Sequence, residues 1–217
     1  MKKLFILLLL VSFASVTMAH SINYELQDAA NGEIVWYYLQ LGFTHILPFG
    51  FDHLLFILAL FIVKPNLKTI LLQATVFTVA HSITLILSML EMIDPPTPQI
   101  ELLIALSIVF IGIENILLKE IKWWRYLIIS MFGLIHGCGF ASAISEIGLP
   151  PQDKFFSLLS FNLGVELGQA AFILLIYLIA IHWLKNKTWF NKGVTVPISF
   201  GISAIAVYWV IERALLI

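Results

Sequence analysis

The sequence predicts an all-α fold: a polytopic membrane protein with six transmembrane helices after a signal peptide. Composition is the first observation, because 60% of the 217 residues are hydrophobic and 12% are charged, against about 45 to 50% and about 25% in soluble domains. The spacing of long apolar stretches is the second observation, and the layout of the N-terminus is the third. The net charge of -1 excludes nucleic acid as an expected partner, because nucleic acid binds basic surfaces.

The first residues have the three-part layout of a secretory signal peptide. Lys2 and Lys3 precede an apolar core from Leu4 to Val16, and small residues follow as far as Ala19. That core is shorter than the roughly 20 residues that a spanning helix needs. An uncleaved signal anchor is the alternative interpretation. The expected organisation is a signal peptide (1–19), a short periplasmic segment (20–35) and a six-helix transmembrane domain (36–217).

Six apolar stretches follow, separated by short segments rich in Pro, Gly, Asn and charge. Each is close to the roughly 17 to 25 residues that a tilted helix needs to cross the hydrocarbon layer. The stretches are Trp36–Val63, Leu67–Leu90, Ile100–Leu118, Tyr126–Ile147, Phe155–Trp183 and Val194–Ile211. The segments between them leave no room for a soluble domain.

Lysine and arginine residues predict the orientation, because loops retained in the cytoplasm carry the excess of these residues. With a periplasmic N-terminus, the inside loops hold eight: Lys64, Lys68, Lys119, Lys122, Arg125, Lys185, Lys187 and Lys192. The outside segments hold two, Lys154 and Arg213. We therefore expect a protein of the bacterial inner membrane with both termini in the periplasm.

Five ionisable residues on four predicted helices lie at a similar depth, near the middle of the bilayer. They are Asp52, His53, His81, His136 and Glu166, each about eleven to thirteen residues from the end of its span. An ionised group at mid-bilayer costs about 2.5 to 3.5 kcal/mol on insertion scales, so such residues normally face the bundle interior and mark a site or pathway. Their convergence predicts a shared polar site.

Polar neighbours on the same helix faces extend this site. Asn162, Glu166 and Gln169 recur at i, i+4 and i+7 and form one oxygen-rich stripe. Pro48 and Gly50 can kink or break the first span, and the carbonyl groups released there are tolerated only against a cavity or buried protein. His45, which precedes this break, therefore need not keep a regular helical relation to the residues after it.

The donor atoms available favour a transition metal bound through nitrogen and oxygen. The single cysteine excludes a thiolate-rich site, and imidazole with carboxylate suits divalent nickel, cobalt, zinc or iron. We expect His53, His81 and His136 to be metal ligands, with Asp52 and Glu166 as a ligand, an orienting group or a proton acceptor. Four residues are expected to line the route or support the ligands: His45, Asn162, Gln169 and Glu101.

Each residue also has a purely structural interpretation. Polar side chains hold membrane helices together through hydrogen bonds, so a single histidine is weak evidence of a ligand. Asp52 and His53 could form a closed structural pair, and Glu166 could be protonated and bonded to Asn162 or His81. Glu101 and Glu114 lie near span ends, where the simplest interpretation is interfacial, with Glu101 also placed to bind an entering ion.

Five motifs follow one another between Leu41 and Gln169: GFTHILPFGFDHLLFILAL, FTVAHSITL, IELLIALSI, FGLIHGCGFA and FNLGVELGQ. In this order they resemble the HupE/UreJ family of bacterial membrane proteins, in its second, longer-motif branch. The resemblance implies a six-helix inner-membrane protein, with a cleaved signal peptide in many members. It also implies nickel uptake for hydrogenase or urease, the role commonly assigned to the family.

Three functions remain open on these residues. The first is a permease for a divalent transition metal, with nickel or cobalt favoured. The second is a metal-dependent intramembrane enzyme, hydrolase-like, in which a zinc-type histidine site activates water and Glu166 or Asp52 is the general base. The third is an assembly protein whose polar residues only join helices. The expected partners are the lipid bilayer and the metal ion, with self-association into a homo-oligomer left open.

Overall fold

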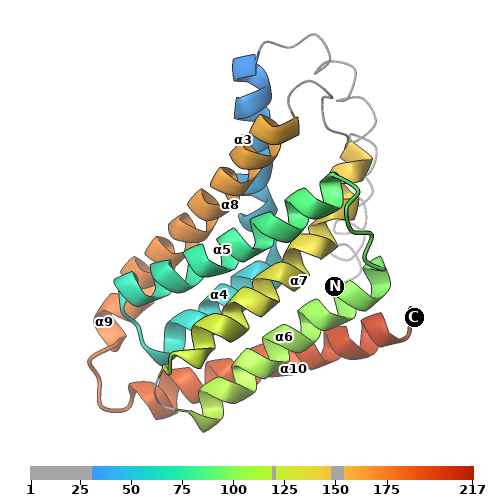
Figure 1. The fold of residues 1–217 in the computed structure, drawn as a ribbon. Helices are drawn as coiled ribbons and strands as arrows, with labels where there is room; N and C mark the ends of the chain where they lie inside the picture. The colour runs from blue at the N-terminus through green and yellow to red at the C-terminus, as the bar shows by residue number, and fades with distance from the viewer. Residues whose placement is uncertain (1–30, 119–120, 148–153) are drawn as a thin grey trace, which may run out of the picture.

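The computed structural model describes residues 31–118, 121–147 and 154–217, and these residues form helices and no strand (Figure 1). The predicted signal peptide and most of the predicted periplasmic segment lie outside the described residues. The elements are α3 (Asn31–Ile46), α4 (Phe51–Val63), α5 (Leu67–Met89), α6 (Thr97–Leu117), α7 (Trp124–Ile147), α8 (Lys154–Ile176), the π-helix η1 (Tyr177–Ile181), α9 (His182–Leu184), the π-helix η2 (Asn191–Thr195) and α10 (Val196–Ala214). The all-helical prediction is confirmed for this part of the chain.

The first predicted span differs most from expectation. Instead of one helix over Trp36–Val63, the chain forms α3 and α4, which are bent by 65° at a short break. Pro48 and Gly50 lie in that break. The helix is interrupted there because proline lacks a backbone N–H and cannot continue the helical hydrogen-bond pattern. The remaining helices begin and end within a few residues of the predicted limits.

The number of spans is only partly supported. Within the described residues, four helical segments are long and apolar enough to cross a membrane, and the bent pair α3 and α4 makes a fifth. The four are α5, α6, the continuous run Lys154–Leu184 and the run Asn191–Ala214. Helix α7, with 24 residues, is not among them, so the six-span count stays a prediction.

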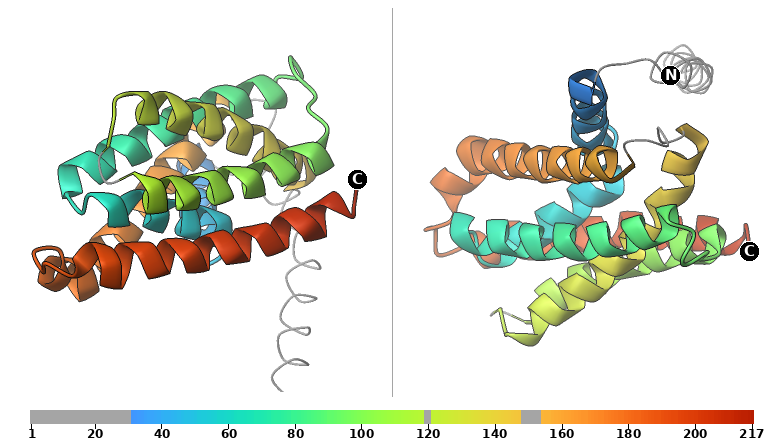
Figure 2. Two further views of the ribbon diagram at one scale, coloured as in Figure 1. Left: turned by 90° about the horizontal axis from the view of Figure 1, so that it is seen from below. Right: turned by 45° about the horizontal axis from the view of Figure 1, so that its top comes forward.

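The helices pack as three close pairs around the short helix α4 (Figure 1). Helix α3 packs on α8, α5 on α7 and α6 on α10, and Figure 2 shows α6 and α10 running side by side. Helix α4 contacts members of all three pairs and buries most of its side chains. Small residues permit these approaches: a Cβ on Gly164 would collide with the carbonyl oxygen of Leu39, and one on Gly137 would collide with that of His81.

Gly164→Ala is expected to lower the free energy of unfolding by about 1 to 3 kcal/mol, because the added methyl group overpacks the contact between α8 and α3. Gly201 on α10 is the matched control, since a Cβ there would meet no atom within 4 Å. Gly201→Ala should be neutral or stabilising by up to about 1 kcal/mol, because alanine favours the helix. Unfolding of the purified variants in detergent measures both effects, and equal changes would contradict the packing described.

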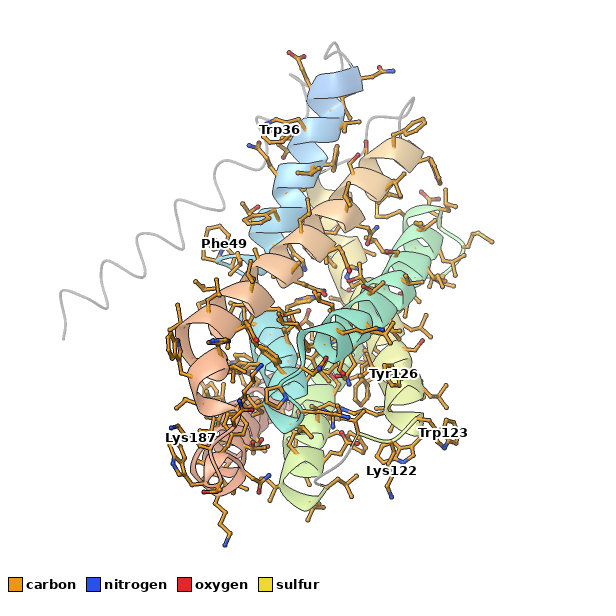
Figure 3. All side chains as sticks on the ribbon, turned by 90° about the vertical axis from the view of Figure 1, so that its left-hand side faces the viewer. Trp36, Phe49, Lys122, Trp123, Tyr126 and Lys187 are labelled. Carbon is orange, nitrogen blue, oxygen red and sulfur yellow. The ribbon has the colours of Figure 1, made fainter. Side chains whose placement is uncertain are left out.

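The two ends of the bundle differ in charge. Figure 3 shows Lys122, Trp123 and Lys187 at one end, whereas Trp36 lies at the other. We call the first the lysine-rich end. The end of α10, which lies beside the start of α6 (Figure 1), is called the C-terminal end. Two hydrophobic clusters fill the interior. One joins α4 to the helices toward the lysine-rich end, and the other joins α3 to α8 toward the opposite end.

Candidate metal centre

Four histidines from four helices meet between the two hydrophobic clusters. The His53 ring on α4 is central: its centroid lies 4.8 Å from that of His45 on α3, 5.0 Å from His136 on α7 and 6.1 Å from His81 on α5. His53, His81 and His136 are 3%, 0% and 1% exposed. Aromatic rings enclose the group. Phe77 lies beside the rings of His53, His81 and His136, and Phe140 lies against the ring of His45.

The break between α3 and α4 brings His45 to His53. In an uninterrupted helix two residues eight positions apart would be separated by about 12 Å along the axis. The 65° bend closes this separation, and Gly50 makes the bend compact because a Cβ at that position would collide with the His45 carbonyl oxygen. A sequence feature that looks like a helix breaker therefore places a histidine beside the site.

The contact between α5 and α7 brings His81 toward His136. Gly137 lies against the His81 carbonyl group, and Thr84 Oγ1 on α5 donates a 2.7 Å hydrogen bond to the Leu134 carbonyl oxygen on α7. These contacts hold the two helices face to face at the depth of the histidines. Residues far apart in the sequence thus share one site through a glycine-mediated helix contact.

Two overlapping groups of side chains could hold a metal ion within the described residues. One comprises His45, His53 and His81, and the other comprises Asp52, His53 and His136. In each group the potential ligand atoms lie within 4.8 Å of one another. His53 belongs to both, so it is the residue that every arrangement of the site requires.

Hydrogen bonds distinguish the two groups. Asp52 Oδ1 accepts a 2.8 Å hydrogen bond from the His53 backbone N–H and lies 3.1 Å from His53 Nδ1. A carboxylate on one ring nitrogen fixes the tautomer and leaves the other nitrogen as a lone-pair donor. His53 Nε2 is buried and makes no hydrogen bond among the described residues, as is true of His45 Nε2 and both ring nitrogens of His81. This favours the three-histidine group, with Asp52 orienting His53 from behind.

His136 and Asn162 flank that group. His136 Nε2 lies 3.4 Å from Ser107 Oγ on α6, and its Nδ1 is buried without a hydrogen-bond partner in the described residues. The Asn162 side chain lies close to the His81 ring, and its Oδ1 is likewise buried without a partner. A buried polar atom left unsatisfied costs about 1 to 3 kcal/mol. Several unpartnered ring nitrogens and an amide oxygen in one place fit a site that is completed by a bound ligand. Imidazole with amide oxygen suits a divalent transition metal.

Glu166 and Gln169 connect α8 to α5 outside both groups. Glu166 Oε1 accepts a 2.6 Å hydrogen bond from Thr75 Oγ1, and Gln169 Oε1 accepts one of 3.2 Å from Thr78 Oγ1. The predicted depth of Glu166 agrees with that of the histidines, but Glu166 lies outside both groups. It shares a helix face with Asn162, which lies close to the His81 ring, and is about 6 Å further along the axis of α8. Its observed partner is also neither Asn162 nor His81, the two partners considered from the sequence.

Glu101 also lies outside both groups. Its carboxylate Oε2 lies 3.2 Å from Arg213 Nη2 on α10, and Arg213 Nη1 donates a 2.7 Å hydrogen bond to the Glu101 backbone carbonyl oxygen. The structure therefore places this residue in an ion pair at the C-terminal end of the bundle.

The interfacial interpretation of Glu114 is wrong. Glu114 is 6% exposed and forms an ion pair with Arg125, which is 1% exposed. Arg125 Nη2 also donates to Asn115 Oδ1 at 3.1 Å, and Asn115 Nδ2 donates to the Ala59 carbonyl oxygen on α4 at 2.7 Å. The clue in the sequence was the opposite charges at the facing ends of two predicted helices joined by a short loop.

The sequence analysis also missed Ser107 and the enclosing aromatic rings. Ser107 on α6 is 1% exposed, and its hydroxyl group lies 3.4 Å from His136 Nε2. Phe140 and Phe161 stack with ring centroids 4.8 Å apart beside His45. A serine or phenylalanine inside an apolar stretch gives no signal by itself, because its role depends on which helix lies opposite.

Comparison with known proteins identifies the family. No curated protein and no solved structure matches the chain. The family model described as HupE / UreJ protein matches residues 21–213, nearly the whole chain, and this confirms the resemblance seen in the motifs. With its helical membrane fold and a histidine cluster suited to a metal ion, the chain belongs to the HupE/UreJ family, which is associated with nickel and cobalt transport.

Proposed function

We propose that this protein is an inner-membrane permease for a divalent transition metal, with nickel as the favoured substrate and cobalt as the next. The observation that carries the proposal is the group of three imidazoles, His45, His53 and His81, whose ligand atoms lie within 4.8 Å of one another. They come from three different helices of a membrane protein. An ion bound there would have to enter and leave the bilayer interior.

In this proposal the ion binds to Nε2 of His53, to His45 and to His81, and Asp52 orients His53. His136 and Asn162 are the reserve donors on either side, so an ion can exchange one ligand for another as it moves. A transport site must bind firmly enough to admit an ion and weakly enough to release it. Imidazoles on several helices meet that requirement, because a small relative movement of α3, α4 and α5 changes the number of ligands.

The proposed topology has six spans, with α7 as the sixth, and both termini in the periplasm. Its support is the set of lysines at one end of the bundle, Lys122 and Lys187 among them (Figure 3), because cytoplasmic loops carry the excess positive charge. The roles of Glu166 and Gln169 in this proposal are to line the α5 and α8 side of the route. Glu101 lies on its periplasmic side.

The enzyme alternative is not favoured. The family to which the chain belongs is associated with transport. The proposed general base Glu166 is bonded to Thr75 and lies outside both groups of potential ligands. No observation on the described residues supports a substrate other than the ion itself.

Nickel accumulation tests the proposal directly. Cells expressing the chain are expected to accumulate radioactive nickel faster than cells without it, and His53→Ala should reduce the rate to that of cells without the protein, because both groups need this residue. Initial uptake rates, normalised to the amount of protein in the membrane, are the measurement. His182→Ala is the matched control, since this exposed histidine lies near Tyr177 and outside the cluster. Uptake that is unchanged in His53→Ala would overturn the proposed site.

A further inference from the structure

The ion pair between Glu101 and Arg213 lies at the C-terminal end of the bundle, where α6 begins and α10 ends. The two side chains are 38% and 20% exposed, and they form part of the wall of a cavity of about 370 Å³ at that end of α6 and α10. Arg213 also lies over the Trp209 ring at 5.6 Å. The pair is thus open to the cavity on one side.

The other side of the pair faces the site. Glu101 Oε1 lies 3.7 Å from the position that a Cβ on Gly139 would take, and Gly139 follows His136 on α7 by three residues. Glu101 is also close enough to Asp52 for the two carboxylates to interact. The pair therefore lies between the cavity and the turn of α7 that follows His136.

Helix α6 sets the distance between the pair and the site. Ser107, whose hydroxyl group lies 3.4 Å from His136, follows Glu101 by six residues on the same helix, or about 9 Å along its axis. A hydrated ion that entered through the cavity would meet Glu101 and Arg213 before it met the histidines.

We propose that the Glu101–Arg213 ion pair is the outer gate of the metal route, opened when the entering cation displaces Arg213 from Glu101. This inference rests on the proposed function. The carboxylate of Glu101 attracts a divalent cation and can bind it, whereas the guanidinium of Arg213 repels the cation and occupies the carboxylate. The two residues therefore act in opposite directions on ion entry, and their mutual bond neutralises the pair and closes the entrance. Glu212, which also lines the cavity, keeps a negative charge there that attracts cations.

The contrast with the second ion pair on α6 supports this assignment. Glu114 and Arg125 are buried, and the Arg125 guanidinium is also bonded to Asn115. An ion pair without access to solvent or a cavity is costly to open. The partly exposed pair at Glu101 can exchange its partner for water or an ion, so it is the one suited to open in every transport cycle.

Opposite effects of the two single variants test the gate. With nickel well below saturation, Arg213→Gln is expected to raise the initial uptake rate at least about threefold, and Glu101→Gln to lower it at least about threefold, because charge at an entrance acts mainly on the association rate. The double variant should return to within about twofold of the wild-type rate. Nickel uptake by intact cells, normalised to protein in the membrane, is measured. Glu91→Gln, the same charge change at an exposed site at the same end, is the control.

A pair that only holds α6 to α10 predicts a different result. Both single variants would then slow uptake, and this outcome would overturn the gate while leaving the permease intact. If Glu101→Gln does not fold, Arg213→Gln alone decides, because unchanged or slower uptake contradicts the gate. A wild-type protein that neither binds nor imports nickel would overturn the proposed function itself, and the gate with it. Nickel binding to the purified protein separates these two failures.

Discussion

Replacing His81 with alanine is expected to weaken nickel binding at least about 100-fold, which corresponds to about 2.7 kcal/mol. Both ring nitrogens of His81 are buried without a hydrogen-bond partner in the described residues, and the ring belongs to the three-histidine group. Its loss removes a ligand and leaves a void in a fully buried position. The effect is large because only two imidazoles of the three-histidine group, His45 and His53, then remain.

His136→Ala is expected to weaken nickel binding less than about tenfold, because His136 would support the ligands without itself being required for binding. His136 Nε2 already lies near Ser107 Oγ, and the residue lies outside the three-histidine group. Equilibrium dialysis of the purified variants against nickel measures both constants. A larger loss in His136→Ala than in His81→Ala would move the ion to the group formed by Asp52, His53 and His136.

Replacing Glu114 with glutamine is expected to lower the free energy of unfolding by about 3 to 5 kcal/mol, because it leaves the buried Arg125 guanidinium without a counter-charge. Arg125 is 1% exposed and cannot turn toward solvent without disrupting the packing of α6 and α7. Asn115 would also lose its fixed position, and with it the hydrogen bond to the Ala59 carbonyl oxygen on α4. The pair thus anchors the helix that carries His53.

The double variant Glu114→Leu with Arg125→Met provides the control. Two apolar side chains of similar volume remove both charges together, so the double variant should be close to wild type in stability or above it. Glu101→Gln is the matched comparison at the exposed pair, with an expected loss of less than about 1 kcal/mol. Unfolding in detergent measures all three, and a small effect of Glu114→Gln would contradict the burial of this pair.

The sequence predicts depth well because depth is a one-dimensional quantity. The distance of His53, His81 and His136 from the ends of their spans follows from a fixed rise per residue, and all three lie in the cluster. Glu166 has the same predicted depth and yet lies beside Thr75. Depth leaves open the direction of a side chain around its helix and the identity of the neighbouring helix, and these decide contact.

His45 shows the limit most clearly. Six residues separate it from Asp52, and the sequence indicates that Pro48 and Gly50 interrupt the helix there, but the angle of the interruption is set by what packs around it. The 65° bend, with Gly50 against the His45 carbonyl group, places the ring 4.8 Å from His53. A residue expected to line the route is thereby brought into the group of potential ligands.

The sequence by itself determined the helical membrane class, the limits of the helices after the first span and the depth of the central histidines, because hydrophobicity and helical rise act locally along the chain. Its motifs also indicated the family. Only the tertiary structure decided that His45 approaches His53, that Glu166 is bonded to Thr75 and that Glu114 is buried against Arg125. These outcomes depend on how helices rotate and pair, which glycine contacts such as Gly137 against His81 fix across the bundle.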